Sequence, residues 1–269
     1  MKIYAITVVK NEQDIINYTL RNAAAWADKV IVYDNGSTDG TWEKINRLKS
    51  SVIIPFKQDD APYTDGLRAD IFNSFKSEME DGDWWVIQDS DEIYNQSPRD
   101  FLAIQKGYFH HVNGKKIDFS FDLKNLESVT LSGDFEKDLK YFSFCSPRAW
   151  SEPRMIKHRS RLVWETQNIW PNHMGLVCSQ TIGIRHYPLR SLEQIRERWE
   201  VRKGVKERGG QLFDHWQKED WKEYYAQKVN ELVKVNSNIF EEIPLANTYK
   251  QGTIKRLLKS VLHGLKLLP

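Results

Sequence analysis

Four short apolar runs, separated by segments with helical periodicity, constrain the fold of this chain most strongly. The runs lie at residues 3–9, 30–33, 52–55 and 84–87, and each has the length of a buried strand. Between the first two runs, apolar residues recur at helical spacing, as in Ile16, Leu20 and Ala23. Strands that alternate with helices form a parallel sheet with helices on both faces. Residues 1–95 therefore predict an α/β layer.

Polar residues directly follow three of the predicted strands. They lie at residues 10–11, 34–35 and 89–91. Ligands of open parallel sheets bind at the carboxyl ends of the strands, so we expect these three segments to converge on one site. Asn11 is also expected to cap the helix that follows it.

The fourth predicted strand ends in three carboxylates, Asp89, Asp91 and Glu92. A buried strand that delivers clustered acids is costly unless a cation lies there. Asp89 and Asp91 are two residues apart, so on an extended chain they face the same side. Carboxylate oxygens are typical ligands of hard divalent cations. Our hypothesis is a metal ion that holds a nucleotide diphosphate, and the alternative is a solvated acidic turn.

The composition of the 269-residue chain is that of an ordinary globular protein, with 40% apolar and 28% charged residues. No apolar run approaches the roughly 20 residues of a membrane span. The first run ends in Lys10-Asn11-Glu12 without a cleavage-like site, which predicts a strand and not a signal peptide. Cys145 and Cys178 lack metal-type spacing, so we expect reduced, buried thiols and a cytoplasmic location.

Beyond residue 95 the pattern loosens. Residues 116–165 are strand-like but irregular, and a late strand is predicted at 181–187. A highly charged helix is predicted from Ser191 to about Arg208, and charge runs of this kind are usually solvated faces. Another helix is predicted at residues 215–233. The resulting division is a first domain at 1–190, with a nucleotide-binding half at 1–95 and an acceptor half at 96–190, followed by a helical region at 191–269.

The last predicted helix, at residues 253–267, is basic and amphipathic. Its apolar stripe consists of Ile254, Leu257, Leu258, Val261, Leu262 and Leu265. Its basic residues lie off the stripe, and no acid follows Glu242. Such a helix suits the surface of an anionic membrane, and the alternative is packing on its own domain or on a partner subunit. Because the basic residues alternate with leucines and not with stacking aromatics, we expect no nucleic-acid binding.

Three segments, 6–12, 32–41 and 89–91, together resemble the signature of family 2 glycosyltransferases. The resemblance covers residues 1–95 well and residues 100–190 only loosely. It implies a GT-A fold, which is a Rossmann-like, mainly parallel sheet with flanking helices, here with a C-terminal helical extension. It also implies a nucleotide-sugar donor, Mn²⁺ or Mg²⁺ as cofactor, and inversion at the anomeric carbon.

The resemblance implies roles for individual residues. The residues that match nucleotide-binding positions are Val8, Asn11, Glu12, Asp34, Asn35, Arg68, Asp89 and Ser90. The residues that match metal ligands are Asp91, Asp89 and His186. Of these, Asp91 is expected to touch the metal directly, and Asp89 to contact the ribose or a metal-bound water. The family often has an acid where this chain has Asn35, and an amide can both donate and accept, so the base of the donor stays open.

Several of these residues also have structural alternatives. Arg68 matches a basic position near the diphosphate, but a solvated arginine on a helix face would look the same. His186 could be a structural histidine. Residues 34–40 could be a plain turn. Arg154, Lys157 and His158 suit either a phosphate or acceptor wall or an ordinary basic strand edge.

An inverting transfer also needs a general base that takes the proton of the acceptor hydroxyl. The base should be a carboxylate on the far side of the sugar from the metal. Glu165 follows a predicted strand and is our first choice, with Glu152 and Asp122 as rivals. A surface role for Glu165 is the alternative.

We therefore expect a metal-dependent inverting glycosyltransferase that moves a sugar from a UDP-sugar to a glycan or lipid-linked acceptor. The expected setting is bacterial lipopolysaccharide or surface polysaccharide biosynthesis, in the cytoplasm or on the inner face of the cytoplasmic membrane. One alternative is a sugar nucleotidyltransferase, although Lys10-Asn11-Glu12 lacks the glycine of its phosphate loop. The other is a non-catalytic carbohydrate-binding or membrane scaffold of the same fold.

Overall fold

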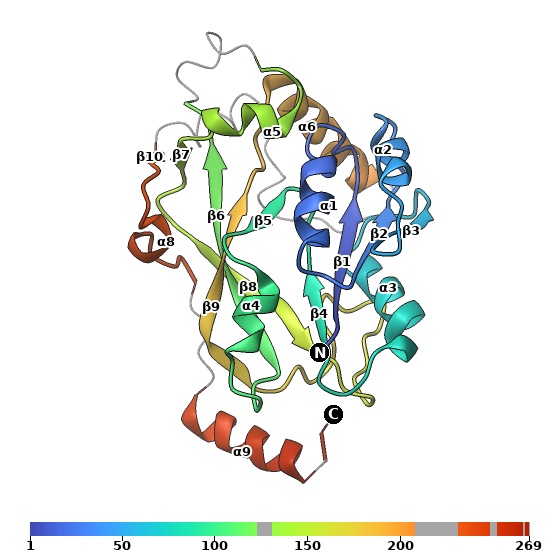
Figure 1. Cartoon of the computed structure of the whole chain (residues 1–269), viewed down its shortest axis with the longest axis vertical. Helices are drawn as coiled ribbons and strands as arrows, with labels where there is room; N and C mark the ends of the chain where they lie inside the picture. Colours follow the sequence, from blue (N-terminus) through green and yellow to red (C-terminus); the bar gives the residue numbers. More distant parts are fainter. Residues whose placement is uncertain (123–130, 208–230, 248–251, 266, 269) are drawn as a thin grey trace.

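The computed structural model describes residues 1–122, 131–207, 231–247, 252–265 and 267–268, which form a mixed sheet with helices on its faces (Figure 1). The strands are β1 (Ile3–Val9), β2 (Lys29–Asp34), β3 (Ile53–Gln58), β4 (Trp84–Ile87), β5 (Glu92–Tyr94), β6 (His111–Ser120), β7 (Phe144–Cys145), β8 (Trp150–Lys157), β9 (Val177–His186) and β10 (Val233–Lys234). The helices are α1 (Ile16–Ala24), α2 (Thr41–Arg47), α3 (Leu67–Phe75), η1 (Lys76–Glu78), α4 (Pro98–Ala103), α5 (Phe135–Asp138), η3 (Leu139–Tyr141), α6 (Leu192–Glu207), α8 (Ile239–Glu242) and α9 (Thr253–Gly264).

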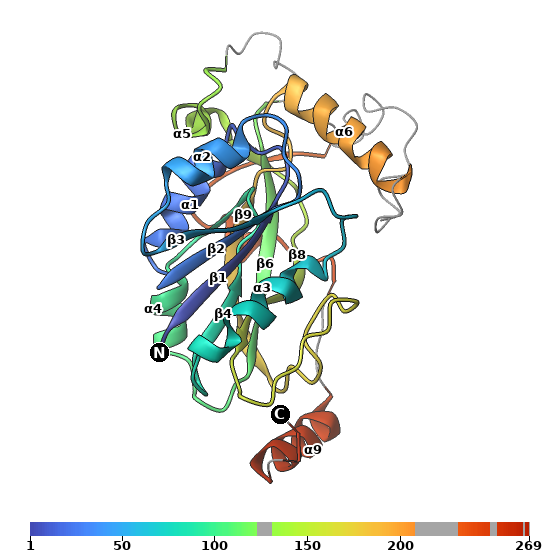
Figure 2. The same ribbon diagram turned by 90° about the vertical axis from the view of Figure 1, so that its right-hand side faces the viewer.

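The amino-terminal part is the predicted parallel layer. β3, β2, β1 and β4 are neighbours in this order and all run parallel. Alternate side chains of β1 enter two different cores: Ile3 and Ala5 pack in the core that includes α1, and Tyr4 and Ile6 in the core that includes α3. Figure 2 shows α1 and α3 on opposite sides of the strands. Because both faces are covered, β1 is apolar at every position except the buried Thr7.

The carboxy-terminal part extends the same sheet with mostly antiparallel strands. β8 pairs antiparallel with β4 and joins the two parts, and β6 lies between β8 and β9. A third core, which includes Phe119, Phe121, Phe142 and Tyr187, fills the space beside β6. The irregular sequence at residues 116–122 and 131–165 therefore folds onto the predicted layer, and the α/β fold expected from the sequence is confirmed.

The short strand that follows the acids of β4 was not predicted. Residues 92–94 form β5, which pairs antiparallel with β9. In this pairing Glu92 lies opposite His186. The acidic segment is therefore held between the end of β4 and the end of β9, which are nearly a hundred residues apart in the chain.

The described helices agree with the predicted ones where they overlap. α6 and α9 cover most of the predicted helices at 191–208 and 253–267, and the helix predicted at 215–233 lies almost wholly outside the described residues. Within the described part of the chain, no helix is long and apolar enough to cross a membrane. Cys145 and Cys178 are buried free thiols, as predicted.

Candidate active site

The loops that follow β1 and β2 are joined by reciprocal hydrogen bonds. The Asn11 backbone N–H donates to Ser37 Oγ at 2.9 Å, and the Thr38 N–H donates to Asn11 Oδ1 at 2.8 Å. Asn11 has φ of 53°, a left-handed conformation that asparagine tolerates better than most residues. The prediction that Asn11 caps α1 is wrong, because the cap position of that helix is Ile15. Asn11 instead fixes the loop after β2.

Asp34 lies at the end of β2 and is completely buried. Its Oδ1 accepts the Ser37 N–H at 2.7 Å, whereas no donor among the described residues satisfies Oδ2. Burial raises the pKa of the Asp34 carboxyl. A buried acceptor without a donor costs about 1–3 kcal/mol, so Asp34 Oδ2 is an atom that a bound ligand could complete. The neighbouring Asn35 donates its amide to the Ala61 carbonyl at 2.7 Å.

Asp89 is held by two arginines from different elements. Arg68 of α3 donates through Nη2 to Oδ1 at 2.8 Å, and Arg154 of β8 donates through Nη1 to Oδ2 at 2.9 Å. Burial alone would raise the pKa of Asp89, but the two guanidinium groups hold it well below its usual range. Arg68 is therefore a buried partner of the acidic segment and not a solvated helix-face arginine.

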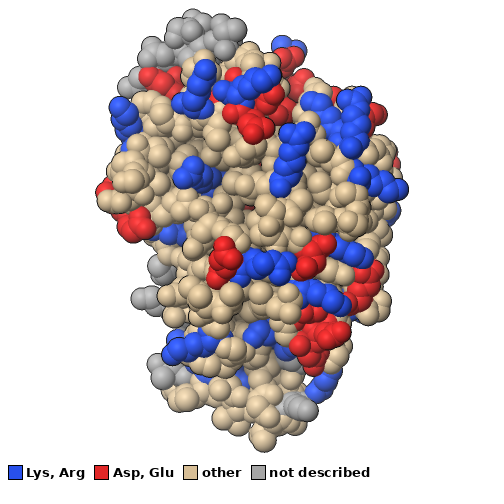
Figure 3. Space-filling model, in the orientation of Figure 1, with Lys and Arg blue, Asp and Glu red and all other residues tan. Residues whose placement is uncertain are grey.

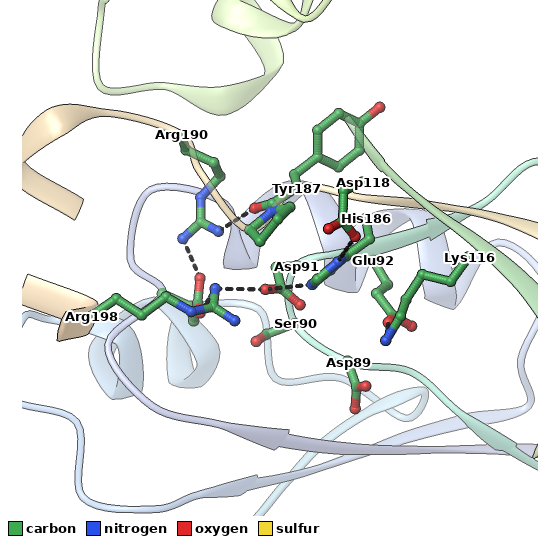
Figure 4. Close-up of polar contacts among 12 residues, drawn as sticks. Asp89, Ser90, Asp91, Glu92, Lys116, Asp118, His186, Tyr187, Arg190 and Arg198 are labelled. Carbon is green, nitrogen blue, oxygen red and sulfur yellow. Dashed lines mark hydrogen bonds and ion pairs between the residues drawn. The ribbon is translucent and has the colours of Figure 1, made fainter. Parts of the chain in front are cut away.

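Asp91 meets a second set of cations (Figure 4). His186 Nε2 lies 3.2 Å from Asp91 Oδ2, and Arg198 of α6 donates to the same oxygen at 2.7 Å. The other ring nitrogen of His186 lies 2.7 Å from Asp118 Oδ1. Burial lowers the pKa of His186, but the carboxylates of Asp91 and Asp118 outweigh it and raise the pKa to about 9. The imidazole is thus held between two acids.

Two arginines connect the end of β1 to this cluster. Arg190 pairs with Glu12 and also donates through Nε to Asp14 Oδ2 at 2.6 Å. Arg198 lies 3.6 Å from Glu12 Oε1 and also binds Asp91. The polar ends of β1 and β4, which are about 80 residues apart in the sequence, therefore share one guanidinium group.

A third group of charges surrounds Arg154, which is only 1% exposed. Its Nη2 donates to Glu92 Oε1 at 2.7 Å and to Glu152 Oε1 at 2.6 Å. Lys116 of β6 completes the group at 2.8 Å from Glu152 and 3.4 Å from Glu92. Buried ions of this kind persist only when each has a close partner of opposite charge. The acidic segment is thus embedded in a network of cations from β6, β8, α3 and α6.

Sequence comparison agrees with this arrangement. The model of glycosyl transferase family 2 matches residues 4–97, the segment that contains β1 to β5. Over this segment the chain is similar to glycosyl transferase family 2. The match confirms the resemblance seen in the sequence, and it includes the ends of β1, β2 and β4. No curated protein matches the chain.

Solved structures are only distantly similar to the chain. TarS (residues 1–349) from S. aureus, in complex with UDP, is 20% identical over 43% of this chain and 35% of its own, with a TM-score of 0.33. The mannosyltransferase PcManGT from Pyrobaculum calidifontis, in complex with GDP-Man and Mn²⁺, is 14% identical over 85% of this chain and 69% of its own, with a TM-score of 0.40. The present chain thus spans about a third of the TarS chain.

The family 2 segment supplies most of the acids of the site, but the cations come mainly from outside it. Arg154 was one of the residues considered for a phosphate or acceptor wall. Arg190 and Arg198 were not predicted as site residues, and they lie in or beside the charged helix that we interpreted as a solvated face. One available signal was the charge balance: acids at the end of a buried strand need cations. Lys157 and His158, in contrast, lie elsewhere, against the rings of Trp84 and Trp85 respectively.

The three candidate bases lie in different surroundings. Glu165 is exposed and its carboxylate accepts the amides of Asn168 and Asn172 at 3.0 and 3.3 Å. The loop of Glu165 touches the start of α3. A Cβ added to Gly66, which precedes that helix, would lie 1.7 Å from the carbonyl oxygen of Thr166, the residue after Glu165. Glu152 belongs to the ion network, and Asp122 follows β6 at the edge of the described residues. The assignment of the base stays a prediction.

The family 2 site can be tested for its fit to a divalent cation. Among the described residues there is no cluster of three or more His, Cys, Asp or Glu side chains arranged to hold a metal. The 3.2 Å between His186 Nε2 and Asp91 Oδ2 is, however, the separation of two ligands that each lie about 2.1 Å from one ion. Carboxylate with imidazole suits Mn²⁺ better than Mg²⁺. This pair fits a cation if Arg198 gives up its contact with the same oxygen.

Proposed function

We propose that this chain is a metal-dependent inverting glycosyltransferase that uses a nucleotide-sugar donor, with a UDP-sugar as the first choice. The observation that carries the proposal is the convergence of Asp34, Asp89, Asp91 and Arg68 from the ends of two strands and one helix. Their positions follow from the parallel sheet, and the family match covers all four. A sheet edge of this kind is where open α/β folds bind their ligands.

Asp34 supports a nucleobase contact. Its buried Oδ2, which no described donor satisfies, suits the single imide N–H of uracil. A buried acceptor that is completed by the correct base, and left unpaired by a wrong one, gives strong discrimination. UDP is therefore expected to bind more tightly than CDP, whose base has no such N–H.

The acids and arginines suit a diphosphate bound through a cation. Asp91, Asp89 and His186 would hold the ion, which when bound supplies Lewis-acid stabilisation of the departing diphosphate. Arg68 lies at the start of α3 beside Asp89, where its guanidinium can pair with phosphate oxygens in bidentate fashion. Arg198, once released from Asp91, lies at the same edge and can take a phosphate oxygen in turn.

The acceptor hydroxyl needs a base that is free to take a proton. The pKa of Glu152 is lowered to about 2, because Arg154 and Lys116 outweigh the effect of its burial. A carboxylate that is so strongly paired is a poor base at neutral pH. Glu165 carries no such ion pair among the described contacts, so it remains our proposed base. Glu165→Gln should lower kcat strongly, whereas Glu152→Gln should act mainly on stability.

The proposed setting is the assembly of a bacterial lipopolysaccharide or surface polysaccharide, on a glycan or lipid-linked acceptor. The apolar, basic α9 supports a peripheral position on the inner face of the cytoplasmic membrane. A sugar nucleotidyltransferase and a non-catalytic scaffold remain the alternatives to be tested.

The test is a screen of UDP-, GDP- and dTDP-sugars for release of the nucleoside diphosphate, with Mn²⁺ and with EDTA. We expect metal-dependent release from one donor class, faster when the acceptor is supplied. Asp91→Asn should slow it by about 10²–10³-fold, and Asp100→Asn, which changes an exposed acid in the first turn of α4, should not. Undiminished release by Asp91→Asn would remove the metal role. Formation of a nucleotide-sugar and pyrophosphate from a nucleoside triphosphate would favour the nucleotidyltransferase.

A further inference from the structure

The last helix, α9, contacts the rest of the protein through its polar side. Lys259 Nζ donates to the Gly175 carbonyl at 3.2 Å. The centroids of the His263 and His110 rings lie 4.5 Å apart. Burial against the domain lowers the pKa of Lys259. A helix that belongs to a globular core normally turns its apolar stripe inward. α9 does the reverse.

The apolar stripe of α9 therefore faces outward. Its five outward residues are 56–83% exposed: Ile254, Leu257, Leu258, Val261 and Leu265. The segment that carries His110 adds two more exposed apolar side chains, Ile104 at 78% and Tyr108 at 54%. Single exposed apolar residues need no explanation, but a contiguous set marks a surface that binds something.

Charge distinguishes between the candidate occupants. The chain has five Lys and Arg residues after Glu242, and no Asp or Glu. A second copy of the helix would bring the same positive charge to the interface and be repelled. An anionic lipid surface has the opposite charge and an apolar interior, so it complements both features.

We propose that α9 lies flat on an anionic bilayer, with its leucine stripe in the boundary between headgroups and acyl chains. The proposal concerns this helix and does not depend on the sugar-transfer activity. It identifies the partner as phospholipid and the contact as one face of α9 with the neighbouring loop at residues 104–110.

The sheet fixes which end of the protein then faces the lipid. α9 touches His110, which precedes His111 at the start of β6. Across the sheet, His111 pairs with Ile156 of β8 and Ile156 pairs with Trp85 of β4. Trp85 in turn pairs with Tyr4 at the start of β1. The candidate active site lies at the other end of β1. Seven residues of strand span about 23 Å. The lipid-bound protein therefore holds its site away from the bilayer, toward a hydroxyl that the acceptor carries out from the membrane.

Vesicle binding by the full chain tests the lipid contact. Phosphatidylcholine vesicles with and without phosphatidylglycerol are sedimented with the protein and with two variants. The protein should sediment with the anionic vesicles, and Leu257→Glu/Val261→Glu should bind at least about tenfold more weakly, because two apolar contacts are lost. Trp150→Glu, which changes an exposed aromatic residue on β8, should bind normally.

Two results would overturn the lipid proposal. One is a protein that stays in solution with both kinds of vesicle. The other is a double variant that binds as well as the unchanged protein. Light scattering completes the test: a concentration-dependent dimer that the double substitution abolishes, without lipid binding, would assign α9 to a second copy of the chain.

An environment-sensitive fluorophore tests the orientation. It is attached to a cysteine at Leu258 on α9 or at Glu43, an exposed residue of α2 near the site, and the buried native thiols should not react. On anionic vesicles the label at residue 258 should shift to the blue and the label at 43 should not. The opposite pattern would contradict the orientation, whatever the fate of the proposed enzyme activity.

Discussion

The two ends of this molecule depart from the usual distribution of side chains in opposite ways. At the site end, charged residues such as Arg154 and Glu92 are 1% exposed, and at the other end Leu257 of α9 is 63% exposed. Charged residues are seldom fully buried unless they are paired. Figure 3 shows the second end as a surface of mostly uncharged residues with scattered Lys and Arg.

The difference lies in what each end needs. The buried charges satisfy one another, so the site end is complete as a network and sensitive to the loss of any member. The leucines of α9 have no such partners within the described chain, so the opposite end is incomplete without a surface to cover it. Substitutions should therefore act on stability and transfer at the first end and on association at the second.

The largest effect is expected from Asp91→Asn. The substitution keeps the shape of the side chain but removes the charge that faces His186 and Arg198. Loss of one preorganised electrostatic contact lowers turnover by about 10²–10³-fold. Steady-state release of the nucleoside diphosphate measures it, with Asp100→Asn as the matched control. Equal losses in both variants would mean that the Asp91 site has no special role.

The next prediction concerns stability and compares substitutions of two cations of β8, Arg154 and Lys157. Arg154→Met leaves Asp89, Glu92 and Glu152 without their shared partner, which should lower the free energy of unfolding by about 3–5 kcal/mol. Lys157→Met removes a charge from β8 that lies over the Trp84 ring and should cost about 1 kcal/mol or less. Urea unfolding measures both. If the two losses were equal, the ion network around Arg154 would not contribute more to the free energy of unfolding than the contact of Lys157.

A third effect depends on pH and concerns the end away from the site. Burial, with smaller contributions from the charges of Lys259 and Arg159, lowers the pKa of His111 to about 4. The unfolded chain takes up this proton below about pH 6.5 and the folded chain does not, so stability falls as the pH drops from 6.5 to 4. The loss should reach about 3 kcal/mol for this residue.

Urea unfolding between pH 7 and pH 4.5 checks the pH effect. His111→Gln should flatten the dependence, and His173→Gln, which changes an exposed histidine, should leave it unchanged. A slope that is the same in all three proteins would mean that other groups cause it.

The smallest effect is expected from Leu257→Glu on the stability of the protein in solution. The side chain is exposed, so the change should stay within about 0.5 kcal/mol. Leu20→Ala, in the buried face of α1, should cost about 2–5 kcal/mol. Thermal or urea unfolding compares the two. A large loss from Leu257→Glu would show that the stripe of α9 packs against the protein, and the comparison between the two ends would fail.

The sequence was sufficient to predict the parallel layer and the ends of its strands. The runs at residues 3–9 and 84–87 are apolar on both faces, and such runs are typical of buried parallel strands. The polar residues that follow them had to meet at one edge. Asp34 and the Asp89–Asp91 segment could therefore be predicted to share a site from local pattern and topology alone.

The sequence predicted only some of the cations beside these acids: Arg68 and His186 were named as site residues, whereas Arg190 and Arg198 were not. Arg190 and Arg198 are local neighbours of many exposed charges, and periodicity does not tell which face of α6 is turned toward Asp91. Their contacts depend on the pairing of β5 with β9. β5 has only three residues, at 92–94, and a sequence pattern of three residues is too short to predict a strand. The outward stripe of α9 was visible in the sequence, but its direction was not.

The central claim is that the acids at the carboxyl ends of β2 and β4 bind a nucleoside diphosphate together with a divalent cation. Calorimetric titration of the full chain with UDP, in Mn²⁺ and in EDTA, tests it most directly. The account predicts binding that is at least about tenfold tighter with Mn²⁺, and that Asp91→Asn loses this gain. The absence of UDP binding under both conditions, or equal binding under both, would contradict it.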